Sequence, residues 1–221
     1  MKTVLTLQTA LVALVVCFST QSLSSCKKDK EETKEISLQP GANATEGYVN
    51  SYVDYANSNA NGVNQLSITA WTHGGLDERA RAFLKFDFEN VPANATIISA
   101  KLSLYAIPVP GSGNFTDAHF GPTNSFSIRR ITSTLNMSQV NWNNQPTTTT
   151  QNEVIVGQST SSHQDNTDID VTNLVKDMFA NENNGLFMQL QTESIYNIRQ
   201  YCSSFYTDAA KRPKLVLQYK K

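Results

Sequence analysis

Residues 81–88 and 98–105 alternate between apolar and polar side chains, as β-strands with one buried face do. The apolar phase of the first segment holds Ala82, Leu84, Phe86 and Phe88, and its other phase holds Arg81, Phe83, Lys85 and Asp87. A turn over residues 89–94, with Pro92 inside it, separates the two segments. One phase is too polar for a parallel sheet covered on both faces, so the pattern predicts two antiparallel strands with one face in the core.

Shorter alternations continue toward the C-terminus, and we expect further strands at 47–55, 66–68, 126–131, 186–190, 198–204 and 212–219. The break in phase at Arg129 and Arg130 predicts a β-bulge. Residues 71–80, 114–124 and 147–150 are expected to form loops. Thr172 is a suitable N-cap for a helix, because apolar residues follow it at helical spacing. The sequence therefore predicts an all-β fold: an antiparallel β-sandwich of jelly-roll type with one short α-helix.

The N-terminus has the features of an export signal. Lys2 precedes an apolar run over 4–18 that is too short to be a convincing membrane span. Residues 23–26, Leu-Ser-Ser-Cys, read as a bacterial lipobox, which predicts acylation of Cys26; cleavage as an ordinary signal peptide is the alternative. We expect a lipoprotein signal peptide at 1–25, a charged flexible tether at 26–46 and one domain at 47–221. The protein would then be an outer-membrane lipoprotein held to the membrane by its lipid anchor. The sequence is compatible with an anchor in either the periplasmic or the outer leaflet of that membrane.

The composition suits an exported β protein. Among 221 residues, 39% are hydrophobic and only 17% are charged, below the roughly 25% of typical soluble proteins. The formal net charge of −1 gives no reason to expect a nucleic-acid partner. Cys202 is the one cysteine of the expected domain, so no disulfide can form inside it, and a buried small side chain is its expected role.

Several stretches together resemble one family. Residues of the second alternating segment match its pattern: Ile98, Ala100, Leu102, Leu104 and Tyr105. Further matches are V-N-W-N-N-Q-P at 140–146, D-V-T at 170–172 and R-P-K-L-V-L-Q-Y at 212–219. Residues 47–219 thus resemble the DNRLRE family, also called carbohydrate-binding module family 96 or disaggregatase-related domains. The resemblance implies a β-sandwich that binds polysaccharide without catalysis.

Motifs for catalysis or metal binding are missing from the sequence. His73, His119 and His163 do not stand at zinc-ligand spacing, and the Asn-rich loop at 57–62 lacks the carboxylates of a calcium loop. The nucleophile elbow G-x-S-x-G and the phosphate-binding glycine loops are absent. We therefore expect no enzyme activity, no metal and no cofactor.

Aromatic and basic side chains offer the candidate binding surface, because sugar rings stack on aromatic faces and Arg binds carboxylates with a fork of donors. The candidate carbohydrate-binding residues are Trp71, Arg79, Arg81, Lys85, Arg130, Arg199 and Tyr201. The basic ones predict an acidic, possibly uronate-containing polysaccharide as the partner. The alternative is that these are scattered surface residues, and a structural role is favoured for Trp142.

Two other functions stay open on the sequence alone. The first is a structural or adhesive cell-surface protein that binds another protein, which would require a flat apolar patch. The second is a small polysaccharide lyase or hydrolase, which would require a pocket with an acid or a Tyr of shifted pKa.

Overall fold

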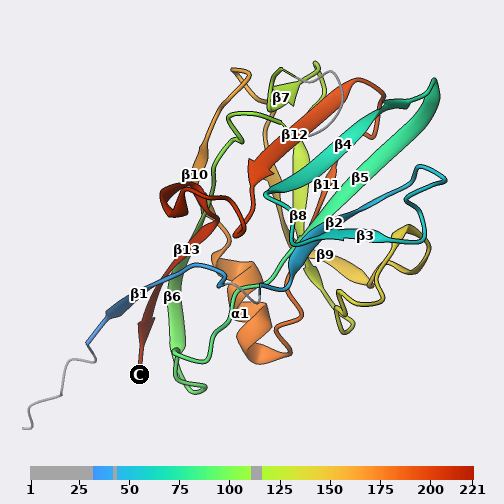
Figure 1. Ribbon diagram of the computed structural model, residues 1–221. Coiled ribbons are helices and arrows are strands. Elements are labelled where there is room, and N and C mark those ends of the chain that lie inside the picture. The colour runs from blue at the N-terminus through green and yellow to red at the C-terminus, as the bar shows by residue number, and fades with distance from the viewer. Residues whose placement is uncertain (1–31, 42–43, 111–115) are drawn as a thin grey trace, which may run out of the picture. The chain divides into compact units, whose positions relative to one another are not determined.

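The computed structural model describes residues 32–41, 44–110 and 116–221, all within the unit Glu31–Lys221. The described residues form thirteen strands, one α-helix and two short 3-10 helices, arranged in two antiparallel sheets (Figure 1). Cys26 and the expected signal peptide lie outside the described residues.

The smaller sheet has four strands in the order β1 (Lys34–Leu38), β13 (Lys214–Lys220), β6 (Thr96–Leu104) and β10 (Asn166–Asp170). The larger sheet has nine strands. Seven of them follow the order β7 (His119–Phe120), β12 (Asn197–Cys202), β4 (Gln65–His73), β5 (Leu76–Leu84), β11 (Leu186–Leu190), β8 (Phe126–Ile131) and β9 (Thr148–Val156). The other two are β2 (Glu46–Asn50), which pairs with β5, and β3 (Asn59–Asn61), which pairs with β2.

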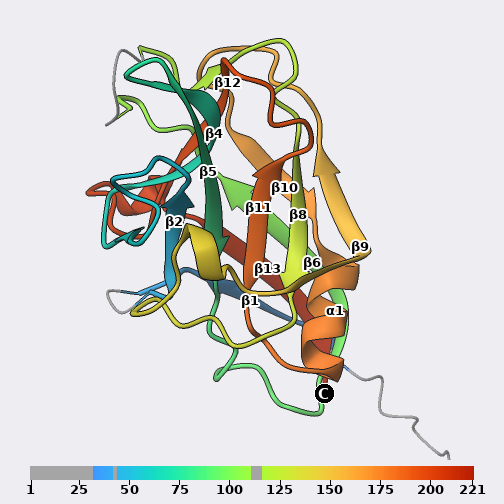
Figure 2. The ribbon, with the colours of Figure 1, turned by 90° about the vertical axis from the view of Figure 1, so that its right-hand side faces the viewer.

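The main core lies between the two sheets, where apolar side chains of β6 and β13 meet those of β4, β5, β8 and β11. In Figure 2, β5, β11 and β8 run in front of β13 and β6, so the sheets are stacked face to face. The helix α1 (Thr172–Ala180) adds Leu174, Val175 and Met178 to this core. The expected antiparallel β-sandwich with one short helix is therefore confirmed.

A second core lies on the other face of the larger sheet. It contains Val49, Phe83, Ile131, Val140 and Phe187, with Leu135, Met137 and Trp142 packed against it. The alternation placed Phe83 on an outward face, but its side chain is completely buried in this second core. Trp142, at the start of the 3-10 helix Trp142–Asn144, packs against the same core, in agreement with its expected structural role. The larger sheet is thus covered on both faces in this region.

The boundaries of several elements differ from the sequence-based expectations. The expected tether at 26–46 is wrong at Lys34–Leu38, which forms β1 and pairs with β13. Three of the four residues of the expected loop at 147–150, residues 148–150, belong to β9. The expected β-bulge is confirmed, because the register of β8 with β9 shifts between Ile128 and Arg130.

The start of α1 also differs from the expected cap. The N-cap residue is Val171, whose side chain forms no capping hydrogen bond. The Thr172 hydroxyl instead accepts a hydrogen bond from the Ala100 amide of β6 at 2.9 Å, and Asp170 accepts one from the Thr172 amide at 3.0 Å. Thr172 therefore joins the helix to the smaller sheet, and the carboxylate of Asp170 binds the first amide of the helix.

Candidate functional site

Residues 71–80, expected to form a loop, are most of a β-hairpin made by β4 and β5. Gly74 and Gly75 form its turn with φ values of +58° and +84°. A two-residue turn with positive φ at both positions matches the right-handed twist of the flanking strands, and glycine adopts these angles without steric cost. The hairpin extends from the upper edge of the larger sheet in Figure 1.

One face of this hairpin carries aromatic side chains. Trp71 and His73 are two residues apart on β4, so they project from the same face. The Tyr52 ring lies 4.2 Å from the His73 ring between centroids, and Tyr55 lies 5.8 Å from it. On the other side, Trp71 packs edge-to-face against Tyr196 at 4.9 Å and Phe120 at 5.8 Å. We call the six rings of Tyr55, Tyr52, His73, Trp71, Tyr196 and Phe120 the aromatic strip.

The strip presents large rings to solvent. Tyr55, Phe120 and Tyr196 are 45%, 49% and 52% exposed, and Trp71 is half-buried. Its members come from the β2–β3 connection, β4, β7 and the segment before β12, so only the folded sheet brings them together. Of these six residues, Trp71 alone was predicted to bind carbohydrate, because no local motif links segments so far apart in the chain.

Tyr196 has a backbone conformation that is rare for a bulky residue, with φ at +69°. Its neighbours hold it there: the Asn197 side chain accepts a hydrogen bond from the Thr123 amide at 2.8 Å and donates one to the Ser194 carbonyl at 3.0 Å. Gly121 must lack a side chain, because a Cβ there would lie 2.3 Å from the Tyr196 carbonyl oxygen. Such strain costs of order 1–3 kcal/mol and is concentrated at functional sites, which favours a functional role for this ring.

A carboxylate lies within the aromatic strip. Glu78 is directly opposite Trp71 in the β4–β5 ladder and therefore shares its face. One carboxylate oxygen accepts a hydrogen bond from the Asn50 amide, and the other lies 3.7 Å from His73 Nδ1. The side chain of Glu78 is 19% exposed, so part of it remains open to a ligand.

Arg79, the other candidate binding residue on this hairpin, is on the face opposite Trp71. Arg79 pairs directly with Ala70, the neighbour of Trp71 on β4. Its guanidinium forms an ion pair with Asp77 at 3.2 Å. Trp71 and Arg79 therefore do not contact a ligand on the same face of the hairpin.

The remaining basic candidates of β5 and β8 do not form an exposed cationic surface. Arg81 is half-buried and donates two hydrogen bonds to Glu193, from Nε at 2.8 Å and from Nη2 at 2.9 Å. Lys85 is half-buried and lies just after the last residue of β5. Arg130 is also half-buried, and its Nε has no hydrogen-bond partner among the described residues.

The expectation that Arg199 and Tyr201 face solvent is wrong, since both side chains are completely buried. They lie directly opposite Ile68 and Leu66 of β4, and directly paired residues share a face. Arg199 Nε donates to the Tyr201 hydroxyl at 3.0 Å, and both residues donate to the Asn166 side-chain oxygen at 2.6 Å. Burial raises the pKa of Tyr201 far above its usual range. Neither residue can contact a polysaccharide from this position.

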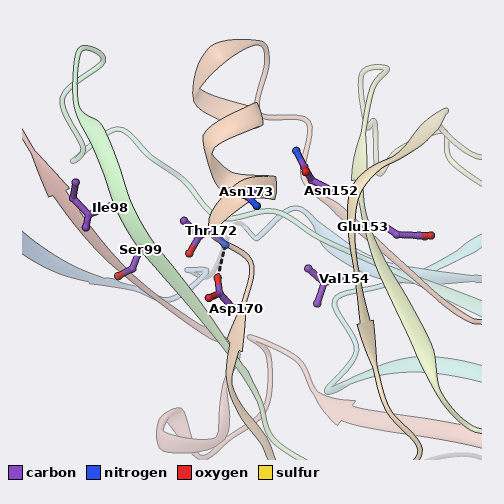
Figure 3. Close-up of a pocket in the computed structure, with 8 residues that line it drawn as sticks. All are labelled: Ile98, Ser99, Asn152, Glu153, Val154, Asp170, Thr172 and Asn173. Carbon is purple, nitrogen blue, oxygen red and sulfur yellow. Dashed lines mark hydrogen bonds between the residues drawn. The ribbon is translucent and has the colours of Figure 1, made fainter.

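A polar cleft of about 510 Å³ lies beside the N-terminus of α1 (Figure 3). Its lining residues are Ile98, Ser99, Asn152, Glu153, Val154, Asp170, Thr172 and Asn173. Hydrogen bonds from Lys101, and then from Thr172, hold the pKa of Asp170 well below its usual range. Glu153 turns its carboxylate away from the other lining residues in Figure 3 and pairs with Arg129 at 2.7 Å. No aromatic ring lines this cleft, so the aromatic strip is the better candidate for stacking on sugars.

Cys202 is buried among Ala106, Ile107 and Ala118, as expected, and burial raises the pKa of its thiol to about 12. Within the described ranges, no group of three or more His, Cys, Asp or Glu side chains is placed to hold a metal ion. No helix in that part of the chain is long and apolar enough to cross a membrane.

Comparison with protein-family models gave a match over most of the chain. The model of carbohydrate-binding module family 96 matches residues 38–219, which include every strand from β2 to β12 and most of β13. No curated protein matches the sequence.

Proposed function

We propose that this protein binds a polysaccharide through its aromatic strip, and we proceed from the premise that the chain belongs to carbohydrate-binding module family 96. Membership of this family makes the chain a carbohydrate-binding domain and supports binding without catalysis. The aromatic strip supports this position for the binding site, because rings from four segments of the chain meet on one face of the β4–β5 hairpin.

The strip offers what a sugar chain requires. Sugar rings have apolar faces of C–H groups that pack on aromatic rings, while their hydroxyl groups need polar partners at the rim. Tyr196 and Phe120 supply exposed rings, and Glu78 and Asn50 supply hydrogen-bonding groups between the rings. Trp71 and His73 are about 7 Å apart along β4. The flanking rings lie 4.2 to 5.8 Å from them on both sides, which gives the strip a maximum length of roughly 20 Å. This length suits several consecutive sugar rings of one chain.

The expectation of an acidic polysaccharide rested on the basic candidates, of which Arg81, Lys85 and Arg199 were expected on outward faces of strands. Arg199 is completely buried and Arg81 is engaged by Glu193, so two of these three cations are not available to uronate groups. We therefore propose that the protein binds sugars through ring stacking and hydroxyl contacts. The experiment compares its affinity for uronate-containing glycans with its affinity for neutral ones.

The test is calorimetric titration of the purified protein with neutral and uronate-containing oligosaccharides of matched length. Trp71→Ala and Tyr196→Ala should each weaken binding about tenfold or more, as expected when a stacking residue at the centre of an interface is lost. Ile155→Ala is the control, because Ile155 is 46% exposed, similar to Phe120, but lies on β9 at the far end of the strand order. Equal affinities for the two strip variants and the parent protein would place the binding site elsewhere.

The absence of catalysis is tested in the same samples. Oligosaccharides incubated with the protein should keep their length and their number of reducing ends. New reducing ends or unsaturated products would replace this proposal with the lyase or hydrolase function. No binding to any glycan would favour the adhesive function, in which the exposed rings contact another protein.

We also propose that the protein is an outer-membrane lipoprotein anchored through Cys26. The Leu-Ser-Ser-Cys sequence at 23–26 supports this, and two or three acyl chains would anchor the protein stably. Cys26→Ala should release the protein from the membrane fraction. Continued fractionation of the variant with outer membranes would contradict lipidation at this residue.

A further inference from the structure

The first half of the aromatic strip is centred on His73, next to the turn of the β4–β5 hairpin. The Tyr52 ring lies 4.2 Å from the His73 ring and is tilted by 34° from it. The Tyr55 ring lies 5.8 Å from the His73 ring and stands at 80° to it. We call these three rings the tyrosine cluster. Because its rings meet at these angles, the cluster can contact one sugar unit from two sides.

The second half of the strip is centred on Trp71, two residues before His73 on the same strand and therefore about 7 Å from it. The Tyr196 ring lies 4.9 Å from the Trp71 ring at 84°. The Phe120 ring lies 5.8 Å from the Trp71 ring at 73°. We call these three rings the tryptophan cluster. The strip therefore contains two angled clusters, and each can hold one sugar unit.

Both ends of the strip are open to solvent. Tyr55 in the tyrosine cluster is 45% exposed, and Phe120 in the tryptophan cluster is 49% exposed. Leu76, directly opposite His73 in the hairpin, is 59% exposed. A site that recognises the end of a sugar chain has to enclose that end, and concave ligand sites bury most of their ligand. Rings that are half exposed at both ends instead leave room for the chain to continue in both directions.

We propose that the aromatic strip has two stacking subsites, one at each cluster, and that it binds the interior of a polysaccharide chain rather than its end. This inference rests on the proposed function, because it concerns the same surface. Once a chain occupies one cluster, its binding to the other cluster is intramolecular, and the high effective concentration raises the affinity. The affinity should therefore rise with the length of the sugar until the chain reaches both clusters, and then level off.

The experiment is calorimetric titration of the purified protein with two series of oligosaccharides, from the disaccharide to the octasaccharide. One series is neutral β-linked xylan and the other is oligogalacturonate. In each series that binds, the affinity of the parent protein should rise about tenfold or more between the disaccharide and the length that reaches both clusters. Beyond that length it should change by less than about twofold. Equal affinities for the disaccharide and the octasaccharide would contradict the two subsites.

Variants of the two terminal rings separate the subsites. Tyr55→Ala and Phe120→Ala should each weaken octasaccharide binding about fivefold or more, because the octasaccharide contacts both clusters. The disaccharide reaches one cluster only, so at most one of the two variants should weaken its binding. Both rings are about half exposed, so neither variant removes a core side chain. Ile155→Ala, on the distant strand β9, is the control and should leave the affinity for every length unchanged.

A second measurement tests the position along the chain. Reduction of the reducing end opens the last sugar ring of the octasaccharide to an alditol and leaves the interior rings intact. The affinity of the parent protein for the reduced octasaccharide should change by less than about twofold. A loss of about tenfold or more would show that the protein recognises the chain end, and it would overturn the inference.

The inference is also overturned if only one of the two terminal-ring variants weakens octasaccharide binding, because the strip then has a single subsite. Failure of the proposed function looks different. In that case Trp71→Ala and Tyr196→Ala bind every length as the parent does, or no glycan binds at all, and the two subsites are then rejected together with the site.

Discussion

The guanidinium of Arg81 lies over the ring of Trp142, with its central carbon 4.5 Å from the ring centroid. The same guanidinium holds both oxygens of Glu193 and contacts Gln145 at 3.2 Å. Arg81 thus joins β5 to two connecting segments that are far apart in the sequence. This geometry assigns Arg81 to the architecture of the larger sheet, and it explains why Trp142 is held in place over the second core.

Replacing Arg81 should therefore lower the stability of the protein. Arg81→Ala leaves the half-buried carboxylate of Glu193 without its donors, and losing hydrogen bonds to a charged group costs about 1–3 kcal/mol. Urea titration measures the change. The double variant with Glu193→Gln should cost less than the sum of the two single variants, because the partners act together. Additive losses would show that the two side chains do not interact.

Phe83 and Phe86 should both be essential to the fold, although they stand in opposite phases of the same alternating segment. Phe83 is completely buried in the second core and Phe86 is 3% exposed in the main core. Truncation of either ring to Ala should cost about 3–5 kcal/mol in urea titration. Val109→Ala is the control, since Val109 is 77% exposed and should change stability by less than about 0.5 kcal/mol. A small loss for Phe83→Ala alone would mean that the second core is loosely packed.

The antiparallel β-sandwich could be predicted from sequence because strands such as β6 and β13 alternate between buried and more exposed side chains. Where a strand is buried on both faces, the alternation of apolar and polar residues does not show which side chains face the main core. Every residue of β12 is buried, so polar side chains such as Arg199 and Gln200 occur in both phases, and alternation gives no direction. The direction of Arg199 is set by its pairing with Ile68, which is far away in the sequence.

The hairpin that carries the site could have been found by a sharper reading of one signal. Gly74-Gly75 is a two-residue turn between strands of nine residues each, and such a pair is typical of a β-hairpin rather than of the expected loop at 71–80. The rest of the aromatic strip gives no such signal. Tyr196 and Phe120 reach Trp71 only because β12 pairs with both β4 and β7, and a single sequence does not reveal that order.

The buried cluster of Arg199, Tyr201 and Asn166 should contribute to stability by joining the two sheets, since β12 and β10 belong to different sheets. Arg199→Ala removes a large buried side chain and the donors to its partners, so we expect a loss of about 3–5 kcal/mol. Tyr201→Phe removes only the hydroxyl and should cost about 1–2 kcal/mol. Stability measured by urea titration should follow this order. A loss below about 0.5 kcal/mol for Arg199→Ala would be typical of a surface residue and would contradict the burial.

The stability of the protein should depend on pH through His119. Its Nε2 donates to the Gln164 carbonyl at 2.9 Å, while its buried Nδ1 has no hydrogen-bond partner among the described residues. Burial, and then the Arg199 charge, lower the pKa of His119 from 6.5 to about 4. Between these two values the unfolded chain binds a proton that the folded chain does not, so the free energy of unfolding falls as the pH falls. At about 1.4 kcal/mol per pH unit, this loss is roughly 3 kcal/mol over the window.

The comparison with His119→Gln isolates this effect. Glu46 works in the opposite direction, because burial raises its pKa and a raised carboxyl pKa favours the folded state at lower pH. The pH dependence of the free energy of unfolding of the parent protein therefore contains contributions from both Glu46 and His119. The difference between the parent and the His119→Gln variant contains the contribution of His119 alone. Urea titrations of both proteins from pH 6.5 to 4 should show the parent losing its advantage over the variant as the pH falls. Parallel profiles would mean that the imidazole has the same proton affinity in the folded and unfolded chains.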